Sequence, residues 1–233
     1  MAIEQHFRRG RRQGSSSALN EEAKQEKEHR KPSHGRELQW ILGSMAVVLA
    51  LLFLGPMVLR EFTSFEYKGL AFTKERFGNI PVFHYSYYFN DELGQRYQYN
   101  LYLRNDPRKN LISMTGDVVF DRLSVALTMN STALAHCPTS LRDIATLSRF
   151  LNDNLILTSP GNIDGEIANA NNLTYVTCES KPRESVIEII PGEETRVEQE
   201  GRCTRIMYAR CEELLPAIEK FMTEAVIDAK QRP

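Results

Sequence analysis

The chain has 233 residues, of which 29 are basic and 30 acidic, and its formal net charge is −1. This balance argues against a nucleic-acid-binding protein, which carries a basic surplus. With 42% hydrophobic residues, the chain is long enough for a membrane segment and one ordinary domain with a hydrophobic core.

The first 37 residues hold nine basic and six acidic residues but few apolar ones. Such a segment buries too little surface to offset the entropy of ordering itself, so we expect a disordered basic cytoplasmic tail. Its basic residues serve as a topology signal, and contact with anionic lipid or nucleic acid is the alternative. The rest of the chain then carries −4, which argues against nucleic acid as a partner of the C-terminal domain.

An uncharged apolar run follows at Leu38–Leu59, interrupted only by Gln39 and Ser44. As a helix it reaches roughly 33 Å, enough to cross a bilayer core of about 30 Å. Lys and Arg are more frequent before the run than after it, which predicts a cytoplasmic N-terminus and an extracytoplasmic domain at residues 60–233. A cleaved signal peptide is the alternative, but residues 58–62 offer no small-x-small cleavage site, so an uncleaved signal anchor of the cell membrane is expected.

Three small residues, Gly43, Ala46 and Ala50, share one face of the predicted span. Small residues allow two membrane helices to approach closely, so this face is a candidate for self-association. Small residues also occur in spans that do not associate, and that alternative stays open. The expected partners are membrane lipid and either another envelope protein or a second copy of this chain.

Beyond the span, residues 81–89 and 96–104 predict an antiparallel hairpin, because apolar side chains alternate along both segments. The alternating residues are Phe83, Tyr85, Tyr87 and Phe89, then Tyr97, Tyr99, Leu101 and Leu103. The aromatic strip has two interpretations: packing into the core, or binding of a flat ligand such as a sugar ring.

The remaining pattern predicts further strands at residues 65–73, 123–129, 173–178, 185–190, 195–199 and 203–209. Helical periodicity is found at residues 140–151 and 212–228. The predicted fold class is α+β, with a mainly antiparallel sheet and two principal helices.

All four cysteines lie after the span, at Cys137, Cys178, Cys203 and Cys211. An even number on the oxidising side of a membrane predicts two disulfides. A metal site is the alternative, but no CxxC pair is present and only two histidines, His84 and His136, accompany the cysteines.

Four cysteines allow three connectivities. A Cys203–Cys211 bond is disfavoured if the residues between them form a strand, because eight extended residues span about 26 Å and a disulfide needs Cα atoms within about 7 Å. A meander of the strands at 173–209 would bring Cys178 and Cys203 to one sheet edge. We therefore predict Cys178–Cys203 with Cys137–Cys211, the alternative being Cys137–Cys203 with Cys178–Cys211.

Signals for chemistry are few. The chain has no HExxH, GxSxG or phosphate-binding glycine loop, so no catalytic, cofactor-binding or metal-binding residue is assigned. Arg104, Asp106 and Arg108 form either an anion-binding loop or an ordinary charged turn. Asn130 and Asn172 begin N-x-S/T sequons and are candidate glycosylation sites.

Residues 65–85 and 99–108, several blocks within 175–221, and the placement of the four cysteines resemble a group of uncharacterised archaeal single-pass membrane proteins. The resemblance implies a prokaryotic cell membrane and carries no assigned activity. The resulting expectation is an envelope protein with an interaction or assembly role. An extracytoplasmic hydrolase-like enzyme and a small-ligand sensor are the alternatives.

Overall fold

The structure is a computed structural model that describes residues 34–90, 93–120 and 124–231, and it divides into two units, residues 1–59 and 60–233. Residues 1–33 of the tail predicted for residues 1–37 lie outside the described residues. A single helix, α2 (His34–Thr63), follows. Its segment Gly35–Leu54 is exposed throughout and is long and apolar enough to cross a membrane.

The second unit contains two sheets. Sheet A is fully antiparallel and consists of four consecutive strands in the order β1-β2-β3-β4. Their bounds are β1 (Ser64–Tyr67), β2 (Leu70–Phe77), β3 (Ile80–Asn90) and β4 (Arg96–Leu103). The hairpin predicted from the alternating aromatic residues is β3–β4, with Tyr87 opposite Tyr99.

Sheet B is mixed, and its strand order is β5-β10-β11-β9-β6-β7-β8. The bounds are β5 (Ser113–Thr115), β6 (Ser124–Met129), β7 (Leu157–Asn162), β8 (Thr174–Tyr175), β9 (Val186–Pro191), β10 (Arg196–Glu200) and β11 (Cys203–Tyr208). Only β10 and β11 pair in antiparallel fashion. The predicted α+β class is therefore confirmed, and its antiparallel character belongs mainly to sheet A.

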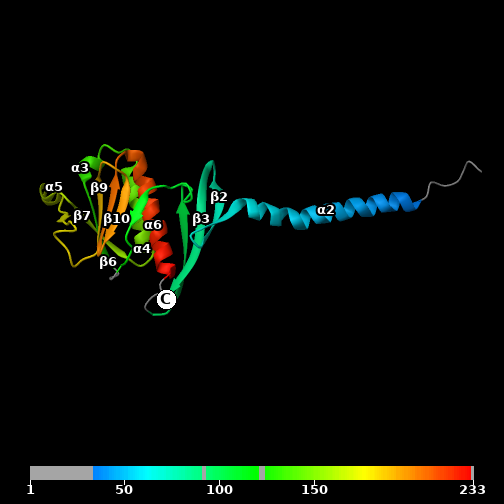
Figure 1. The fold of residues 1–233 in the computed structure, drawn as a ribbon, viewed down its shortest axis with the longest axis horizontal. Helices are drawn as coiled ribbons and strands as arrows, with labels where there is room; N and C mark the ends of the chain where they lie inside the picture. Colours follow the sequence, from blue (N-terminus) through cyan, green and yellow to red (C-terminus); the bar gives the residue numbers. More distant parts are fainter. Residues whose placement is uncertain (1–33, 91–92, 121–123, 232–233) are drawn as a thin grey trace, which may run out of the picture. The chain divides into compact units, whose positions relative to one another are not determined.

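Two long helices form a layer between the two sheets (Figure 1). The two long ones are α4 (Ser140–Asp153) and α6 (Leu214–Gln231), as the sequence predicted. Shorter elements are α3 (Ser131–Leu134), α5 (Gly165–Ala170) and the 3-10 turn η1 (Cys211–Glu213). The helix α6 contacts β10 and β11 of sheet B. Its Glu224 and Glu219 accept hydrogen bonds from Lys68 and from the backbone N–H of Arg104, two residues that adjoin the strands of sheet A.

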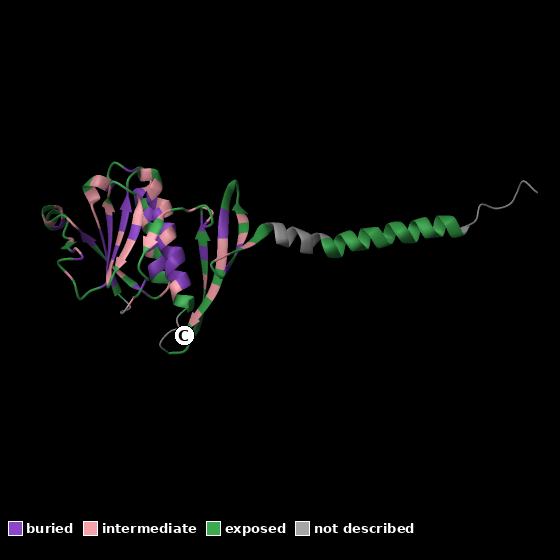
Figure 2. Ribbon diagram, in the orientation of Figure 1, coloured by how far each residue is buried: buried purple, intermediate pink, exposed green. Residues whose placement is uncertain are grey.

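The core runs through α6, which is buried over most of its length (Figure 2). Phe221 and Ile218 are fully buried, and they belong to one cluster with Phe72 of sheet A and Ile206 of sheet B. The sequence predicted one apolar stripe on this helix, whereas the structure covers it from two sides. A helix that is buried all round is what a central layer requires.

The meander predicted for residues 173–209 is wrong. Strand β9 lies parallel to β11, and β10 pairs with the outer side of β11 instead of lying between them. Helix α5 and strand β8 come after β7 in the chain, and β7 and β8 lie on one side of β6 while β9 lies on the other. The chain therefore passes across the sheet between β8 and β9. Alternation within a strand specifies its faces but not its neighbours, which is why the positions of these four strands were predicted and their order was not. The single strand predicted at residues 65–73 is also wrong, because Lys68 and Gly69, both at positive φ, form a turn between β1 and β2.

Candidate functional site

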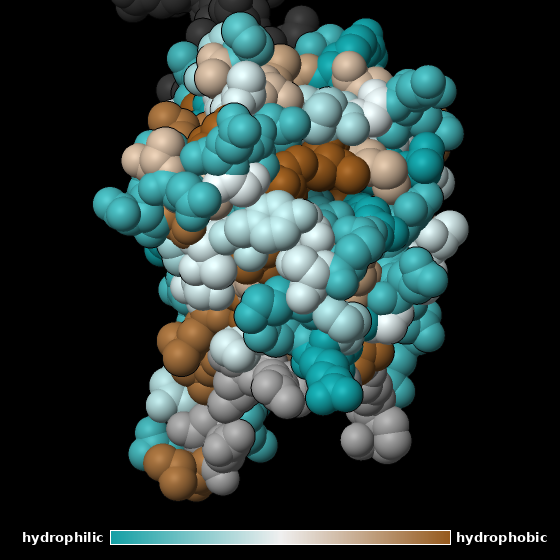
Figure 3. Space-filling view, turned by 90° about the vertical axis from the view of Figure 1, so that its left-hand side faces the viewer, coloured by the Kyte–Doolittle hydropathy of each residue, from teal (hydrophilic) through white to brown (hydrophobic). Residues whose placement is uncertain are grey.

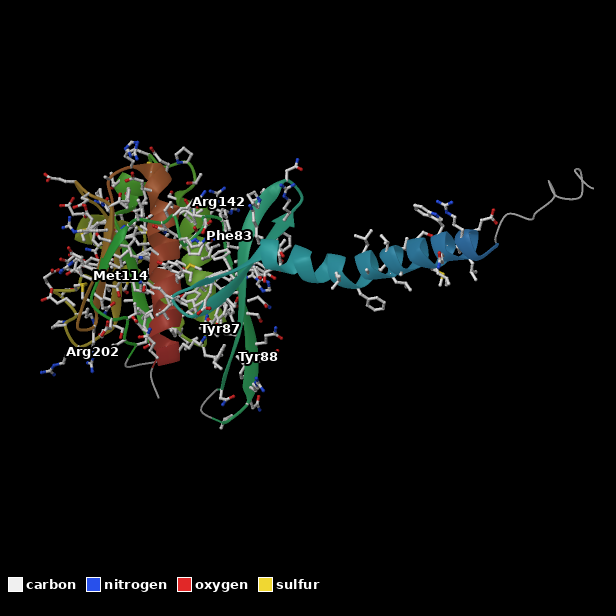
Figure 4. All side chains as sticks on the ribbon, turned by 45° about the vertical axis from the view of Figure 1, so that its right-hand side comes forward. Phe83, Tyr87, Tyr88, Met114, Arg142 and Arg202 are labelled. Carbon is white, nitrogen blue, oxygen red and sulfur yellow. A yellow bond between two sulfur atoms is a disulfide. The ribbon has the colours of Figure 1, made fainter. Side chains whose placement is uncertain are left out.

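The aromatic strip of the hairpin lies mainly against the helical layer. Of the residues labelled on β3 in Figure 4, Phe83 and Tyr87 lie toward the helices, whereas Tyr88 lies on the other side of the strand and is 55% exposed. The ring of Tyr99 meets Phe150 of α4 edge-on at 5.9 Å between centroids. Of the two interpretations, core packing is therefore the one that the described contacts support.

Two tyrosines of this strip, Tyr87 and Tyr99, connect the hairpin to α4 by a hydrogen bond and a ring contact. The hydroxyl of Tyr87 donates to Oδ1 of Asn154, at the C-terminal end of α4, over 2.5 Å. Burial raises the pKa of Tyr87, and it raises the pKa of Tyr99 to about 12. The raised pKa values keep both phenols neutral well above neutral pH, as expected of rings that stabilise by packing.

Strand β4 lies at the edge of sheet A. Among the described residues, β3 is the only strand that pairs with β4, so the other side of this eight-residue strand carries unpaired backbone N–H and C=O groups. Natural proteins protect such edges with proline, lysine, bulges or a very short strand. Strand β4 has no proline and no lysine, and its one charged residue is Arg96 at its start.

A groove of about 660 Å³ runs along this edge. Residues from both faces of β4 line it, which requires the groove to follow the unpaired side of the strand. Its lining residues are Phe77, Tyr97, Gln98, Tyr99, Asn100 and Tyr102 of sheet A, Thr146, Arg149 and Asp153 of α4, and Met222 of α6. A strand edge on one side and a helix on the other is the arrangement that binds extended peptides in strand-addition domains.

The groove carries both apolar and polar surface but little net charge. Tyr97 and Tyr102 are 39% and 41% exposed, and they offer ring surface next to the strand edge. On the α4 side, Nε of Arg149 lies 3.3 Å from Oδ2 of Asp153, so the two charges compensate each other. The groove therefore favours an uncharged, partly apolar occupant.

The chain after β4 is fixed to α6 by a buried carboxylate. Glu219 is 3% exposed and accepts hydrogen bonds from the backbone N–H groups of Arg104 and Asn105 and from the Asn105 side chain, at 2.6 to 3.1 Å. Burial raises the pKa of Glu219. This anchor holds β4 in place without covering its free edge.

The next residues of that loop also serve structure. The guanidinium of Arg108 forms two hydrogen bonds with Asp106, at 3.0 and 2.7 Å, and lies 3.7 Å from the centroid of the Phe65 ring. The bond from Arg108 lowers the pKa of Asp106. Between the two interpretations of this loop, the contacts favour a structural turn over an anion-binding site.

The predicted cysteine pairing is confirmed. Cys137 pairs with Cys211 and Cys178 with Cys203, with Cα–Cα distances of 5.3 and 5.5 Å. The first bond joins the approaches to α4 and α6, as predicted. The second holds the segment after β8 against sheet B, although the meander used to predict it does not form.

The second disulfide lies beside an ion pair between a buried carboxylate and a partly exposed arginine. The carboxylate of Glu188, on β9, accepts from the backbone N–H of Cys178 at 2.7 Å and from Nε of Arg205, on β11, at 3.2 Å. Cys178, Glu188 and Cys203 are also the only group of potential metal ligands in the described part of the chain. Because the two sulfurs are bonded to each other, they are not available as thiolate ligands.

The other predicted site residues do not meet in one place. Asn130 precedes α3, and Asn172 lies in the turn between α5 and β8. Gly43, Ala46 and Ala50 lie on the exposed surface of α2, and their role in helix association stays a prediction. Sequence reasoning missed the groove: Arg96–Leu103 lacks edge-protecting residues, but the order of the strands, which makes β4 an edge, is not visible in the sequence.

These features define a class: an α+β domain with two disulfides, a helical layer between two sheets, and an open strand edge beside a helix. No protein-family model, curated protein or solved structure matches the chain.

Proposed function

We propose that the protein is a membrane-anchored, extracytoplasmic interaction protein that binds an extended peptide segment of a partner by adding it to strand β4. The observation that carries the proposal is the unpaired edge of β4 along the groove that it forms with α4. An added strand would satisfy the free backbone groups of β4, and α4 would cover the strand from the other side.

The geometry also indicates which side chains the partner supplies. Side chains of an added strand alternate between the two faces of the sheet. Those on the helical side would lie toward Tyr99 and Met222, which line the groove, and those on the outer side would lie next to Gln98 and Asn100. The proposed ligand is therefore an uncharged peptide with apolar or aromatic residues at every second position.

Three features support the membrane-anchored, extracytoplasmic placement. The helix α2 contains an exposed apolar segment at Gly35–Leu54, Lys and Arg are concentrated before it, and two disulfides suit an oxidising compartment. Protease added to intact cells should digest the C-terminal domain and spare an N-terminal tag. Protection of the domain with loss of the tag would reverse the proposed orientation.

The binding test uses the full chain in nanodiscs and a phage-displayed library of random ten-residue peptides. Selected peptides should carry apolar residues at alternate positions and bind the wild type. The backbone nitrogens of a selected peptide are then methylated one at a time. Methylation of one set of alternate residues should abolish binding, and methylation of the other set should leave it nearly unchanged, because only every second amide faces β4.

Matched substitutions on α4 locate the site. Thr146→Trp places a large ring in the groove and should reduce affinity at least tenfold, whereas Ala145→Trp, on the exposed surface one residue earlier, should not. Binding that is insensitive to both Thr146→Trp and alternate N-methylation would overturn strand addition. A concentration-dependent dimer that Thr146→Trp dissociates would assign the edge to a second copy instead of a foreign peptide.

A further inference from the structure

The two sequons have different structural environments. In the first, Oδ1 of Asn130 accepts a hydrogen bond from the backbone N–H of Ala133 at 2.9 Å and so caps α3. The backbone N–H of Asn130 donates to Ile189 of β9 at 3.2 Å. The side chain that would be modified is thus already used to begin a helix at the end of β6.

The middle residue of the first sequon is also engaged, whereas its hydroxyl residue Thr132 is exposed but lies within α3. Ser131 and Thr132 belong to α3, and Oγ of Ser131 accepts from Nδ2 of Asn162 at 2.7 Å. Asn162 is 1% exposed, so this bond ties the sequon to the buried end of β7. An enzyme that must grip both the asparagine amide and the hydroxyl two residues later would have to unwind α3 first.

The second sequon is presented outward. Asn172 is exposed, has a φ of 52°, and lies in a turn after α5. The turn is held by its backbone: the N–H groups of Asn171 and Leu173 donate to Ile167 and Ala168 at 3.1 and 2.8 Å. In the described part of the chain, no hydrogen bond of the Asn172 side chain is found, in contrast to that of Asn171, which bonds to Ile167.

The hydroxyl residue of this sequon is accessible as well. Thr174 is exposed and begins β8, a two-residue strand at the edge of sheet B. Asparagine tolerates the left-handed backbone region better than most residues, so the turn that exposes Asn172 is formed at little cost. Both groups that a transferase must reach are therefore exposed, Asn172 in a turn and Thr174 at the start of a two-residue edge strand.

We propose that Asn172, and not Asn130, is a site of N-linked glycosylation. The donor is a sugar chain joined through its C1 atom and a phosphate to a membrane lipid. A bond forms between Nδ2 of Asn172 and C1, the bond between C1 and the phosphate oxygen breaks, and the phosphate leaves with that electron pair. The amide releases one proton to a base of the transferase, and no oxidation or reduction occurs.

This proposal rests on the extracytoplasmic orientation proposed above, because the transfer takes place on that side of the membrane. Within the domain, α5 and sheet A lie on opposite sides of the helical layer (Figure 1). The face of the domain on the α5 side is mostly hydrophilic, with hydrophobic residues in separate areas (Figure 3). A sugar chain on Asn172 would therefore leave the groove along β4 open.

The test is peptide mass spectrometry of the full chain, purified from the membranes of the cells that naturally produce it. The peptide containing Asn172 should carry the additional mass of a sugar chain, and the peptide containing Asn130 should not. Asn172→Gln and Thr174→Ala should both remove this mass, Thr174→Ser should retain it, and Thr132→Ala should change nothing.

Unmodified Asn172, or a sugar chain on Asn130, would overturn the proposal. Protease digestion of the same cells separates this failure from that of the proposed function. Unmodified Asn172 on a protease-accessible domain contradicts only the modification, whereas a protected domain contradicts the orientation as well. Thermal unfolding of each variant shows that the loss of mass does not come from misfolding.

Discussion

The edge strands of the two sheets differ in length and in protection. Sheet B ends in β5 and β8, which have three and two residues, and a disulfide holds the segment after β8. Sheet A ends on one side in β4, which has eight residues and an open edge. Short edge strands limit unwanted pairing, whereas a long unprotected edge such as that of β4 can pair with another strand.

The same contrast appears in how each sheet is held. Sheet B carries the buried pair of Glu188 and Arg205 beside a disulfide. Sheet A is held by packing and by contacts to α6, among them the bonds to Glu219 and the ion pair of Lys68 with Glu224 at 2.7 Å. Sheet B thus carries the disulfide and its neighbouring ion pair, and sheet A carries the open edge at which we propose that a peptide binds.

Removal of the disulfides should have the largest effect. The Cys137–Cys211 bond joins residues with a sequence separation of 74, and the Cys178–Cys203 bond joins residues with a separation of 25. Chain-entropy reasoning assigns the two bonds about 4.5 and about 3.5 kcal/mol. Urea unfolding of the two double Cys→Ala variants should reproduce this order. A greater loss for the shorter loop would show that native contacts near sheet B, and not loop closure, set the stabilisation.

The second-largest effect is expected for Arg205→Ala, which should lower the free energy of unfolding by about 3 kcal/mol. The substitution leaves the carboxylate of Glu188 buried without its cation. The side chain of Glu188 is 6% exposed. Arg196→Ala removes a surface pair with Glu198 on the same sheet and should cost less than about 1 kcal/mol. Equal losses in urea unfolding would contradict the view that sheet B depends on its buried pair.

Glu219→Ala should cost about 2 kcal/mol, because three donors of the loop after β4 lose their acceptor. Hydrogen exchange sharpens the comparison between the sheets. Amides of β4 and of residues 104–105 should exchange faster in this variant, while those of β9 and β11 keep their protection. Uniform loss of protection would mean that the two sheets unfold as one unit.

Substitution of Glu219 should also change how the stability of the domain depends on pH. Burial raises the pKa of Glu219 above the ordinary value of 4.5, so the native state binds more protons than the unfolded state between those two pKa values. The free energy of unfolding should therefore fall as pH rises through that window and level off above the native pKa. Glu219→Gln does not titrate there and should lack this slope when urea unfolding is repeated across pH. A parallel pH profile for the two proteins would contradict the assignment.

The smallest expected effect is that of Gln98→Lys on the free edge of β4. The residue is exposed, so stability should change by no more than about 0.5 kcal/mol. A lysine next to the edge discourages strand pairing, so affinity for a selected peptide should fall. A large loss of stability would show that the edge is part of the structural support of sheet A after all.

The sequence by itself determined the local features of this protein. Alternating side chains specified the hairpin of β3 and β4, helical periodicity specified α4 and α6, and a long uncharged apolar run specified the helix α2. These patterns can be read because they depend on the neighbours of a residue along the chain. The cysteine pairing was predicted as well, although one half of it was inferred from a meander that does not form.

Only the tertiary structure decided the relations between elements. The order of the strands depends on contacts between residues far apart in the chain, such as β9 with β11 and β6, and hydrophobic alternation does not encode it. The burial of α6 from two sides, the three bonds to Glu219 and the open edge of β4 likewise depend on contacts between elements, or on their absence among the described residues. The candidate binding groove could not be predicted for the same reason: it lies between a strand and a helix that meet only once the helical layer has packed between the two sheets.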